Sequence, residues 1–68
     1  MRRKLREIRL ERELTQDQIA KEVGITRSHY TKIENGIGNP SLPVAIKIKK
    51  VLNYLNDDLF ASHDTLRA

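Results

Sequence analysis

The sequence predicts a small all-α domain of five helices, and three features support that prediction. The chain has 68 residues, which is enough for one small domain. Apolar residues recur at helical intervals of three and four, and no segment shows the strict alternation of a half-buried strand. Residue types that begin helices stand immediately before these segments, at Thr15, Thr26, Ser41 and Asn56.

The first helix is expected over residues 1–13, because Leu5 and Ile8 share one face and the other positions are mostly long, straight-chain residues. Residues 1–12 contain six bases and two acids, and residues 13–68 contain seven of each, so the net charge of +4 lies entirely in this segment. Positive charge at a helix start opposes the helix dipole. Two interpretations therefore remain open: the cluster binds an external anion such as phosphate, or it is an ordinary solvated terminus.

A second helix is expected to begin after Thr15. The segment Thr15-Gln16-Asp17-Gln18 has the Thr-x-x-Gln pattern of a capping box, and Leu14 and Ile19 are spaced as a hydrophobic staple. Gly24 stands about two turns later, where a left-handed residue is needed to end a helix. The second helix is therefore expected to be short.

The third helix is expected to follow almost at once, with Thr26 as its N-cap, Tyr30 and Ile33 facing inward, and Asn35-Gly36 at its end. Only residues 24–26 separate it from the second helix. Two helices joined by such a short turn have the geometry of a helix-turn-helix, whose second helix can enter the DNA major groove, about 12 Å wide.

Ser41 is the expected cap of a fourth helix that ends at Asn53. A short fifth helix is expected over residues 57–61, after a cap at Asn56. Residues 62–68 show no periodicity and are expected to form a terminal tail, so the domain spans residues 1–61 with the helix-turn-helix at 16–35. The apolar face expected on the fourth helix consists of Leu42, Ala45, Ile48 and Leu52.

These residues resemble the Cro and phage-repressor type of helix-turn-helix regulators, the Xre-like family. The resemblance covers residues 5 to about 60, and the segments that carry it are Thr15-Gln16 through Ala20, Gly24, Ile33-Glu34-Asn35-Gly36 and Asn39-Pro40-Ser41-Leu42. It implies a compact phage-repressor fold. It also implies a sequence-specific transcriptional regulator, a repressor that binds a palindromic double-stranded DNA operator as a homodimer through the major groove.

The resemblance also implies roles for single residues. Gln16 matches the residue that contacts a DNA phosphate at the start of the second helix, and Arg9 and Glu34 match a structural pair that joins the first helix to the end of the third. Helical periodicity independently turns the outer face of the third helix away from Tyr30 and Ile33. The expected contacts to base edges are Thr26, Arg27, Ser28, Thr31 and Lys32. The expected contacts to phosphate are Gln16, Asn35, Arg3 and Lys4.

Two further expectations concern the fourth and fifth helices. Lys49 stands where the family usually has Ala, so it either extends its ammonium to solvent or lies on an altered surface. Four apolar side chains cluster near the C-terminus, and a domain this small is not expected to bury them all. The homodimer interface is therefore expected at Tyr54, Leu55, Leu59 and Phe60.

The composition disfavours several other classes of protein. The chain has no cysteine, which excludes disulfide-stapled miniproteins and thiolate zinc modules and indicates a reducing cytoplasm. The family resemblance implies that this is the cytoplasm of a bacterial cell, with the gene host- or phage-encoded. The longest apolar stretch, residues 42–46, is too short to cross a bilayer, and no signal-peptide pattern opens the chain. No membrane partner is therefore expected.

An enzyme is also disfavoured, because a deep pocket would consume most of so small an interior. His29 and His63 are far apart in sequence and have no further ligands at metal-binding spacing. Ser28 and His29 point about 100° apart on a helix, which prevents pairing of a nucleophile with a base. We expect no catalytic site, metal, cofactor or small-molecule ligand.

The main alternative function is a helical protein-interaction module, antitoxin-like, in which DNA binding is secondary. Arg27 and Lys32 on the outer face of the third helix favour DNA, since a partner-binding face would be apolar or aromatic. A non-specific nucleic-acid binder would be expected to carry more positive charge than +4.

Overall fold

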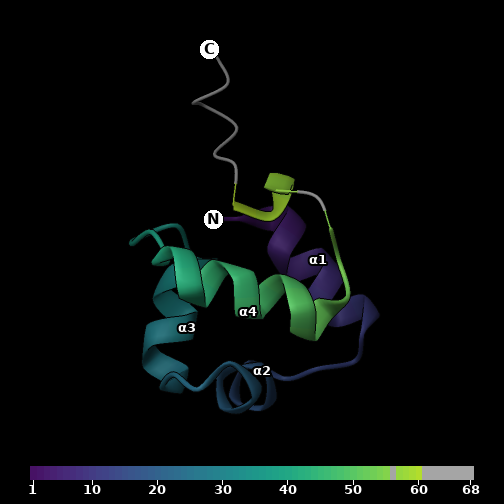
Figure 1. Ribbon diagram of the computed structural model, residues 1–68, viewed down its shortest axis with the longest axis horizontal. Helices are drawn as coiled ribbons and strands as arrows, with labels where there is room; N and C mark the ends of the chain where they lie inside the picture. The colour runs from purple at the N-terminus through teal and green to yellow at the C-terminus, as the bar shows by residue number, and fades with distance from the viewer. Residues whose placement is uncertain (56, 61–68) are drawn as a thin grey trace.

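The computed structural model describes residues 1–55 and 57–60 and contains, within them, four α-helices, one 3-10 helix and no strand (Figure 1). The all-α prediction is therefore confirmed, whereas the count of five helices is not, because the fifth segment is not an α-helix. The segment expected as a fifth helix forms a single four-residue 3-10 turn, too short to repay the cost of nucleating an α-helix. Asn56, Ala61 and the tail 62–68 lie outside the described residues. The elements are α1 (Arg3–Glu11), α2 (Gln16–Val23), α3 (Arg27–Glu34), α4 (Leu42–Leu52) and η1 (Asp57–Phe60).

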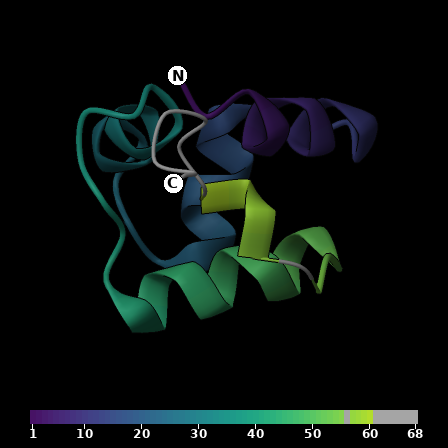
Figure 2. The same cartoon turned by 90° about the horizontal axis from the view of Figure 1, so that it is seen from above.

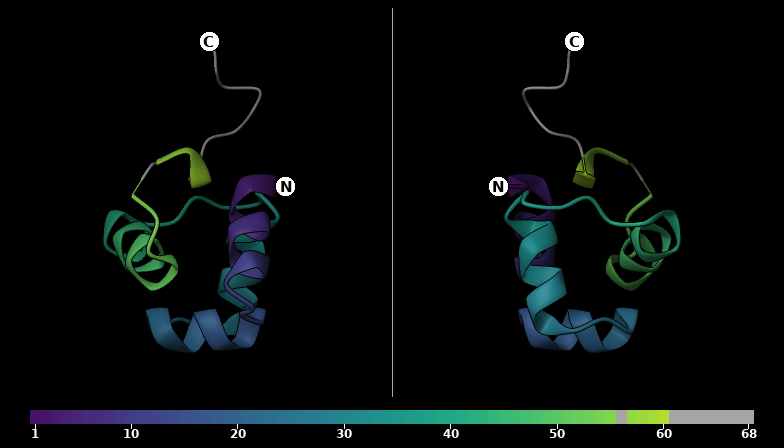
Figure 3. Two further views of the ribbon diagram at one scale, coloured as in Figure 1. Left: turned by 90° about the vertical axis from the view of Figure 1, so that its right-hand side faces the viewer. Right: turned by 90° about the vertical axis from the view of Figure 1, so that its left-hand side faces the viewer.

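The helices enclose one core from several sides. Figure 3 shows α1 and α3 along one side of the molecule, α4 along the other, and α2 across the end between them. Seen from above in Figure 2, η1 lies between α1 and α4, and α1 is in contact with it. The N-terminus lies beside the loop that joins α3 to α4, where the Arg2 backbone N–H donates to the Glu34 carbonyl at 2.8 Å.

The core contains every inward position predicted for the first three helices. Its members come from all five elements, so no helix could bury its apolar face alone. They are Leu5, Ile8, Ile19, Ala20, Val23, Tyr30, Ile33, Ile48, Leu52 and Leu59.

The apolar face predicted for α4 is wrong at Leu42, which is 73% exposed. At 100° per residue, Leu42 lies about 120° around the helix from Ile48, which is fully buried. Val44 and Val51 pack against the core in its place. The inner face of α4 is therefore centred on Ile48 and Leu52.

The predicted helix caps at Thr15, Thr26 and Ser41 are confirmed. The Thr15 hydroxyl accepts from the Gln18 N–H at 3.0 Å, and the Gln18 side chain accepts from the Thr15 N–H at 2.8 Å, which completes the capping box. The Ser41 hydroxyl accepts from the Val44 N–H at 3.4 Å. These bonds satisfy N–H groups that have no partner within their helices.

The first helix ends at Glu11, two residues earlier than predicted. Glu13 adopts the left-handed conformation, with φ of 58°, and its N–H donates to the Leu10 carbonyl at 3.0 Å. Gly24 has φ of 90° and ends α2 in the predicted left-handed conformation. A residue in the left-handed conformation is a common way to end a helix. At Glu13 this conformation lies in the turn that leads from α1 to α2.

Half of the N-terminal basic cluster serves the fold. The Arg2 guanidinium donates to the carbonyls of Ile33 and Gly38, the latter at 2.9 Å. The Arg12 Nε donates to the Leu52 carbonyl at 2.8 Å, and Arg9 is paired within the protein as described below. Cations near the carbonyl ends of helices satisfy acceptors that have no helical partner. These three arginines therefore fit neither interpretation of the cluster, since they are bonded within the protein and are neither simply solvated nor free for an external anion.

Candidate nucleic-acid interface

The third helix presents one charged and polar face to solvent. Its N-terminus is fixed by Thr26, whose hydroxyl accepts from the His29 N–H at 3.0 Å. Its inner face consists of the buried Tyr30, Ile33 and Glu34, and α3 packs against α2. The residues of the segment 26–35 that remain exposed are Thr26, Arg27, Ser28, His29, Lys32 and Asn35.

The predicted base-contacting residues therefore divide into two groups. Thr26, Arg27, Ser28 and Lys32 are exposed, and neither Arg27 nor Lys32 forms an ion pair in the described part of the chain. Thr31 is half-buried, and its hydroxyl donates to Gln16 Oε1 at 2.9 Å. Four of the five side chains are thus exposed to a ligand, although the Thr26 hydroxyl also accepts the cap bond, while the Thr31 hydroxyl is bonded to Gln16.

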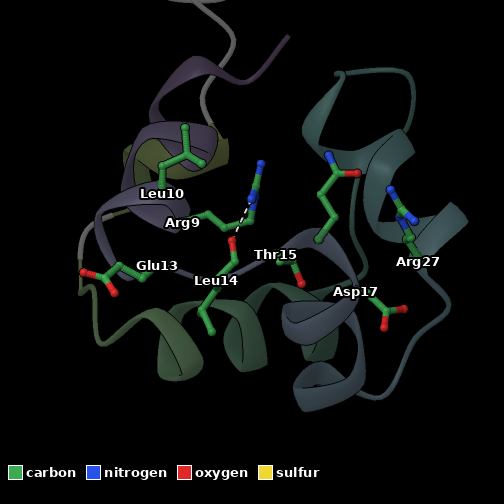
Figure 4. A pocket seen from close by; sticks show the side chains of 8 residues that line it. Arg9, Leu10, Glu13, Leu14, Thr15, Asp17 and Arg27 are labelled. Atoms are coloured by element: carbon green, nitrogen blue, oxygen red, sulfur yellow. Dashed lines mark hydrogen bonds between the residues drawn. The ribbon is translucent and has the colours of Figure 1, made fainter.

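An open hollow of about 580 Å³ lies beside this face, at the junction of three helices (Figure 4). Arg9 reaches it from α1 and Arg27 from α3, and Thr15 and Asp17 at the start of α2 lie between them. The first N–H groups of a helix have no intrahelical partner and favour anions. The hollow therefore offers the Arg27 guanidinium and a helix N-terminus to one region of solvent, while the Arg9 guanidinium in its wall is only 9% exposed and donates within the protein. Its lining residues are Arg9, Leu10, Glu13, Leu14, Thr15, Gln16, Asp17 and Arg27.

The Gln16 side chain lies at the inner edge of this hollow and bonds to two residues of α3. Its Nε2 donates to Glu34 Oε1 at 3.2 Å, and its Oε1 accepts from Thr31. An amide nitrogen carries two hydrogens, so one remains after the bond to Glu34. Gln16 is half-buried and keeps access to the hollow.

Glu34 accepts hydrogen bonds from all three helices of this corner. Arg9 Nε donates to Oε2 at 2.8 Å, Arg9 Nη2 donates to Oε1 at 3.1 Å, and the Tyr30 hydroxyl donates to Oε2 at 2.7 Å. With the Gln16 bond, these contacts supply two donors to each oxygen of the buried carboxylate. We refer to Arg9, Gln16, Tyr30 and Thr31 around the Glu34 carboxylate as the Glu34 network.

The ionisation of the network follows from these bonds. Burial raises the pKa of Glu34, but the hydrogen bonds from Arg9, Tyr30 and Gln16 outweigh it, and the pKa lies below its ordinary value. The hydrogen bond to Glu34 raises the pKa of Arg9. Burial and the neighbouring carboxylate raise the pKa of Tyr30. The carboxylate and guanidinium are thus charged, and the phenol is a neutral donor.

Of the predicted phosphate contacts outside Gln16, Arg3 and Asn35 each follow a residue of the backbone hydrogen bond from the Arg2 N–H to the Glu34 carbonyl, at 2.8 Å. Asn35 is exposed at the C-terminal end of α3, and Arg3 is exposed at the start of α1. The Lys4 ammonium lies 5.9 Å from the centroid of the Tyr54 ring, a cation–π distance, so it contacts the segment after α4. The structure therefore does not place Lys4 with Gln16 in one group.

The four residues predicted at the dimer interface have different environments. Leu59 is 0% exposed and belongs to the core of its own chain, which corrects the expectation that it awaits a partner. Tyr54 and Phe60 are half-buried against the same core, and Leu55 is 89% exposed. The physical reason is η1, which brings Leu59 back over α1.

A second hollow of about 280 Å³ adjoins Leu55. The half-buried Lys49 is one of the residues along it. The sequence left two alternatives for this residue, an ammonium extended to solvent or an altered surface, and both place its side chain at the surface of α4. The residues that line this hollow are Ile46, Lys49, Lys50, Asn53, Tyr54 and Leu55.

Sequence reasoning missed the role of Arg2. Its side chain is buried, its Nη2 donates to Asn39 Oδ1 at 2.6 Å, and its Nε is a buried donor without an acceptor in the described residues. Burial lowers the pKa of Arg2. The residue precedes the first helix and has no apolar spacing, so no local pattern identifies it. The Tyr30 hydroxyl was missed for a similar reason, because periodicity reports only that the ring faces inward.

Two kinds of feature are absent from residues 1–55 and 57–60. No group of three or more His, Cys, Asp or Glu side chains is arranged to hold a metal ion in these residues. No helix among them has the length and apolar character needed to cross a bilayer.

Comparison with known proteins agrees with the geometry of α2 and α3. A family model described as helix-turn-helix matches residues 5–58. An uncharacterised HTH-type transcriptional regulator of Archaeoglobus fulgidus is 42% identical over 94% of this chain and 91% of its own length. The HTH-type regulator YqaF of Bacillus subtilis is 44% identical over 79% of this chain and 71% of its own length.

A more distant relative carries a functional name. The cryptic phage CTXphi transcriptional repressor RstR of Vibrio cholerae is 29% identical over 91% of this chain and 56% of its own length. No solved structure gives a significant match. The family is one of DNA-binding transcriptional regulators and not of enzymes. On the family match and the regulator relatives, this chain belongs to the Cro and phage-repressor type of helix-turn-helix transcriptional regulators, the Xre-like family.

Proposed function

We propose that this chain is a repressor that binds a palindromic double-stranded DNA operator as a homodimer, with α3 in the major groove. The observation that carries the proposal is the outer face of α3. Arg27, Ser28 and Lys32 project from a helix whose inner face is held by the core and the Glu34 network. A rigid helix with free polar side chains is what recognition of base edges requires.

The charges on this face favour particular base contacts. Arg27 can donate two hydrogen bonds to guanine O6 and N7, whereas the short Ser28 accepts or donates with little preference. Lys32 lies slightly more than one turn after Ser28, so both side chains project from the outer half of the helix. We assign sequence recognition to these three residues, together with Thr26 at the cap.

The hollow at the start of α2 is suited to a backbone phosphate. Gln16 offers one amide N–H, and the helix N-terminus adds its dipole. Contacts of this type orient a protein on DNA without distinguishing sequences. Arg3 and Asn35, both exposed, are proposed as further phosphate contacts.

The proposed homodimer uses the surface around Leu55. Leu55 and Ile46 are exposed, and the half-buried Tyr54 lies with them along the second hollow. A two-fold pair of this kind would place two α3 helices on half-sites about 34 Å apart, one turn of DNA. The proposed location is the reducing cytoplasm of a bacterial cell, with the gene carried by the host or a phage. The repressor name of the Vibrio cholerae phage relative supports repression as the direction of control.

Selection of bound duplexes from a random pool, repeated at two salt concentrations, tests this proposal. The expected result is one inverted-repeat consensus at both salt concentrations, with weaker overall binding at the higher one. A pool that shows no enrichment at either concentration would contradict the proposal. That outcome would favour the antitoxin-like alternative, in which the chain binds a protein and DNA contact is secondary.

A further inference from the structure

Gln16 is held by two residues of the recognition helix α3 before any DNA is bound. Thr31 Oγ1 lies 2.9 Å from Gln16 Oε1, and Gln16 Nε2 lies 3.2 Å from Glu34 Oε1. The side chain therefore spans from α2 to α3 and is fixed at both atoms of its amide group.

The orientation of this amide follows from chemistry. An ionised carboxylate only accepts hydrogen bonds, so the amide nitrogen must face Glu34 and the amide oxygen must face Thr31. The oxygen only accepts, so the Thr31 hydroxyl must be the donor. The single hydroxyl hydrogen of Thr31 is thereby used, and one hydrogen of the Gln16 nitrogen remains unused.

We propose that Thr31 is a positioning residue that sets the Gln16 amide for phosphate contact, and that it does not contact base edges. This inference rests on the proposed phosphate role of Gln16. Thr31 is half-buried, in contrast to Ser28 and Lys32 on the exposed face of the same helix.

The Glu34 network makes the support rigid. Arg9 and Tyr30 hold the Glu34 carboxylate with three hydrogen bonds, so the acceptor for Gln16 cannot rotate independently. A glutamine side chain that is free in solution loses rotamer freedom when it binds. A side chain that is already ordered does not lose that freedom again, so the phosphate contact becomes stronger.

The arrangement also couples the two DNA-contacting helices. A phosphate bound at Gln16 is connected through Thr31 to the middle of α3, so the position of the DNA backbone sets the position of the helix in the groove. Loss of the Thr31 hydroxyl is therefore expected to weaken binding to every duplex and to leave the preferred sequence unchanged.

The test compares four variants with the parent protein: Gln16→Ala, Thr31→Val, Thr31→Ser and the double variant Gln16→Ala with Thr31→Val. Affinities are measured for the selected operator and for a scrambled duplex. Gln16→Ala is expected to weaken both about tenfold, and Thr31→Val about fivefold, the range for loss of one hydrogen bond. The double variant is expected to match Gln16→Ala alone, because Thr31 acts only through Gln16. Thr31→Ser retains the hydroxyl and is expected to bind as the parent does.

The free protein gives a readout that needs no DNA. The two side-chain N–H resonances of Gln16 are expected to be widely separated in the parent and in Thr31→Ser, and to approach the free-amide positions in Thr31→Val. Thermal unfolding of each variant reports whether the fold is retained. If Thr31→Val fails to fold, Thr31→Ala replaces it, with the same expected affinities and amide shifts.

The possible failures can be distinguished. If Gln16→Ala binds DNA as the parent does, the proposed phosphate role of Gln16 falls and this inference falls with it. If Gln16→Ala weakens binding but Thr31→Val does not, only the inference is overturned. A change of the selected consensus in Thr31→Val would show that Thr31 contacts a base, which overturns the inference and leaves the proposed function intact.

Discussion

The Arg9 guanidinium lies against the Glu34 carboxylate with two hydrogen bonds, from Nε to Oε2 at 2.8 Å and from Nη2 to Oε1 at 3.1 Å. The side chains are 9% and 2% exposed. A third nitrogen of the guanidinium, Nη1, donates to the Leu14 carbonyl at 2.7 Å. The pair therefore joins α1, the turn before α2 and the end of α3, and it anchors the corner of the fold from which Gln16 and Arg27 project.

Removal of either member of this pair is expected to destabilise the protein. Arg9→Ala leaves a buried carboxylate, and Glu34→Ala leaves a buried guanidinium together with the Tyr30 hydroxyl. Each is expected to lower the free energy of unfolding by about 3 kcal/mol, the lower end for breaking a buried pair. The double variant is expected to lose less than the sum. Denaturant unfolding of all four proteins measures this, and strict additivity would show that the pair contributes no coupling.

Stability is expected to fall in acid because of Glu34. Its pKa in the folded protein is below the ordinary value of 4.5, so the unfolded chain takes up the proton first. The stabilisation is therefore complete above about pH 4.5 and decreases as the pH falls through the lower folded-state pKa. Glu34→Gln, unfolded in denaturant across pH 3–6, is expected to lack this part of the pH dependence. An unchanged slope in the variant would assign the acid sensitivity to other groups.

Arg27→Ala is expected to change which sequence is bound. If Arg27 contacts guanine, its removal should cost about 1–3 kcal/mol on the preferred site and relax the preference at one base pair. Duplex selection with the variant measures this, and Gln16→Ala is the control that should weaken all duplexes alike. Equal weakening on every duplex by Arg27→Ala would make Arg27 a phosphate contact, consistent with its position at the rim of the hollow in Figure 4.

Arg2→Met is expected to destabilise the fold, while Arg3→Met is expected to be nearly neutral. Methionine retains an apolar stem but removes the donors to Ile33, Gly38 and Asn39. Buried acceptors without partners cost about 1–3 kcal/mol, whereas changes at exposed positions such as Arg3 stay within about 0.5 kcal/mol. Denaturant unfolding of the two variants checks the contrast. Equal stability of the two would mean that water replaces the Arg2 bonds without loss.

Leu55→Glu is expected to prevent dimerisation without unfolding the chain. Leu55 is exposed, so the substitution leaves the core intact, but a charge at the centre of the proposed interface would lose its hydration on association. Leu42→Glu, also at an exposed leucine, is the matched control and should dimerise as the parent does. Sedimentation at tens of micromolar, with and without operator duplex, measures the outcome. A parent protein that stays monomeric even on the operator would refute the interface.

Helix boundaries were largely predictable because the interactions that form them are local. The Thr15 capping box, the Thr26 and Ser41 caps and the left-handed Gly24 each involve residues within four positions of one another. The chemistry of such a signal depends little on the rest of the chain. The end of α1 at Glu11 was missed by two residues, because Glu13, the left-handed residue that follows the helix, is not a glycine and carries no sequence signal.

Positions that depend on distant segments were not predictable in this way. Periodicity placed Thr31 on the outer half of α3, but its hydroxyl bonds to Gln16 on another helix. The apolar character of Leu59 suggested a surface that a second chain would bury. The side chain is instead buried within its own chain, because η1 packs against α1. In both cases the residue type was informative, and its partner was decided by packing.

The sequence by itself determined four helices, the caps of α2, α3 and α4, the three-residue turn between α2 and α3, and the charged outer face of α3. Only the tertiary structure decided the roles of Arg2 and Arg12, because their acceptors are distant in sequence. Arg2 meets Ile33 across 31 positions and Arg12 meets Leu52 across 40, whereas the pairing of Arg9 with Glu34 across 25 positions was already implied by the family resemblance. Capping and periodicity act within one or two turns of a helix. A long cationic side chain is bound by whichever carbonyls and carboxylates the packed helices bring to it, and that choice exists only once the core has formed.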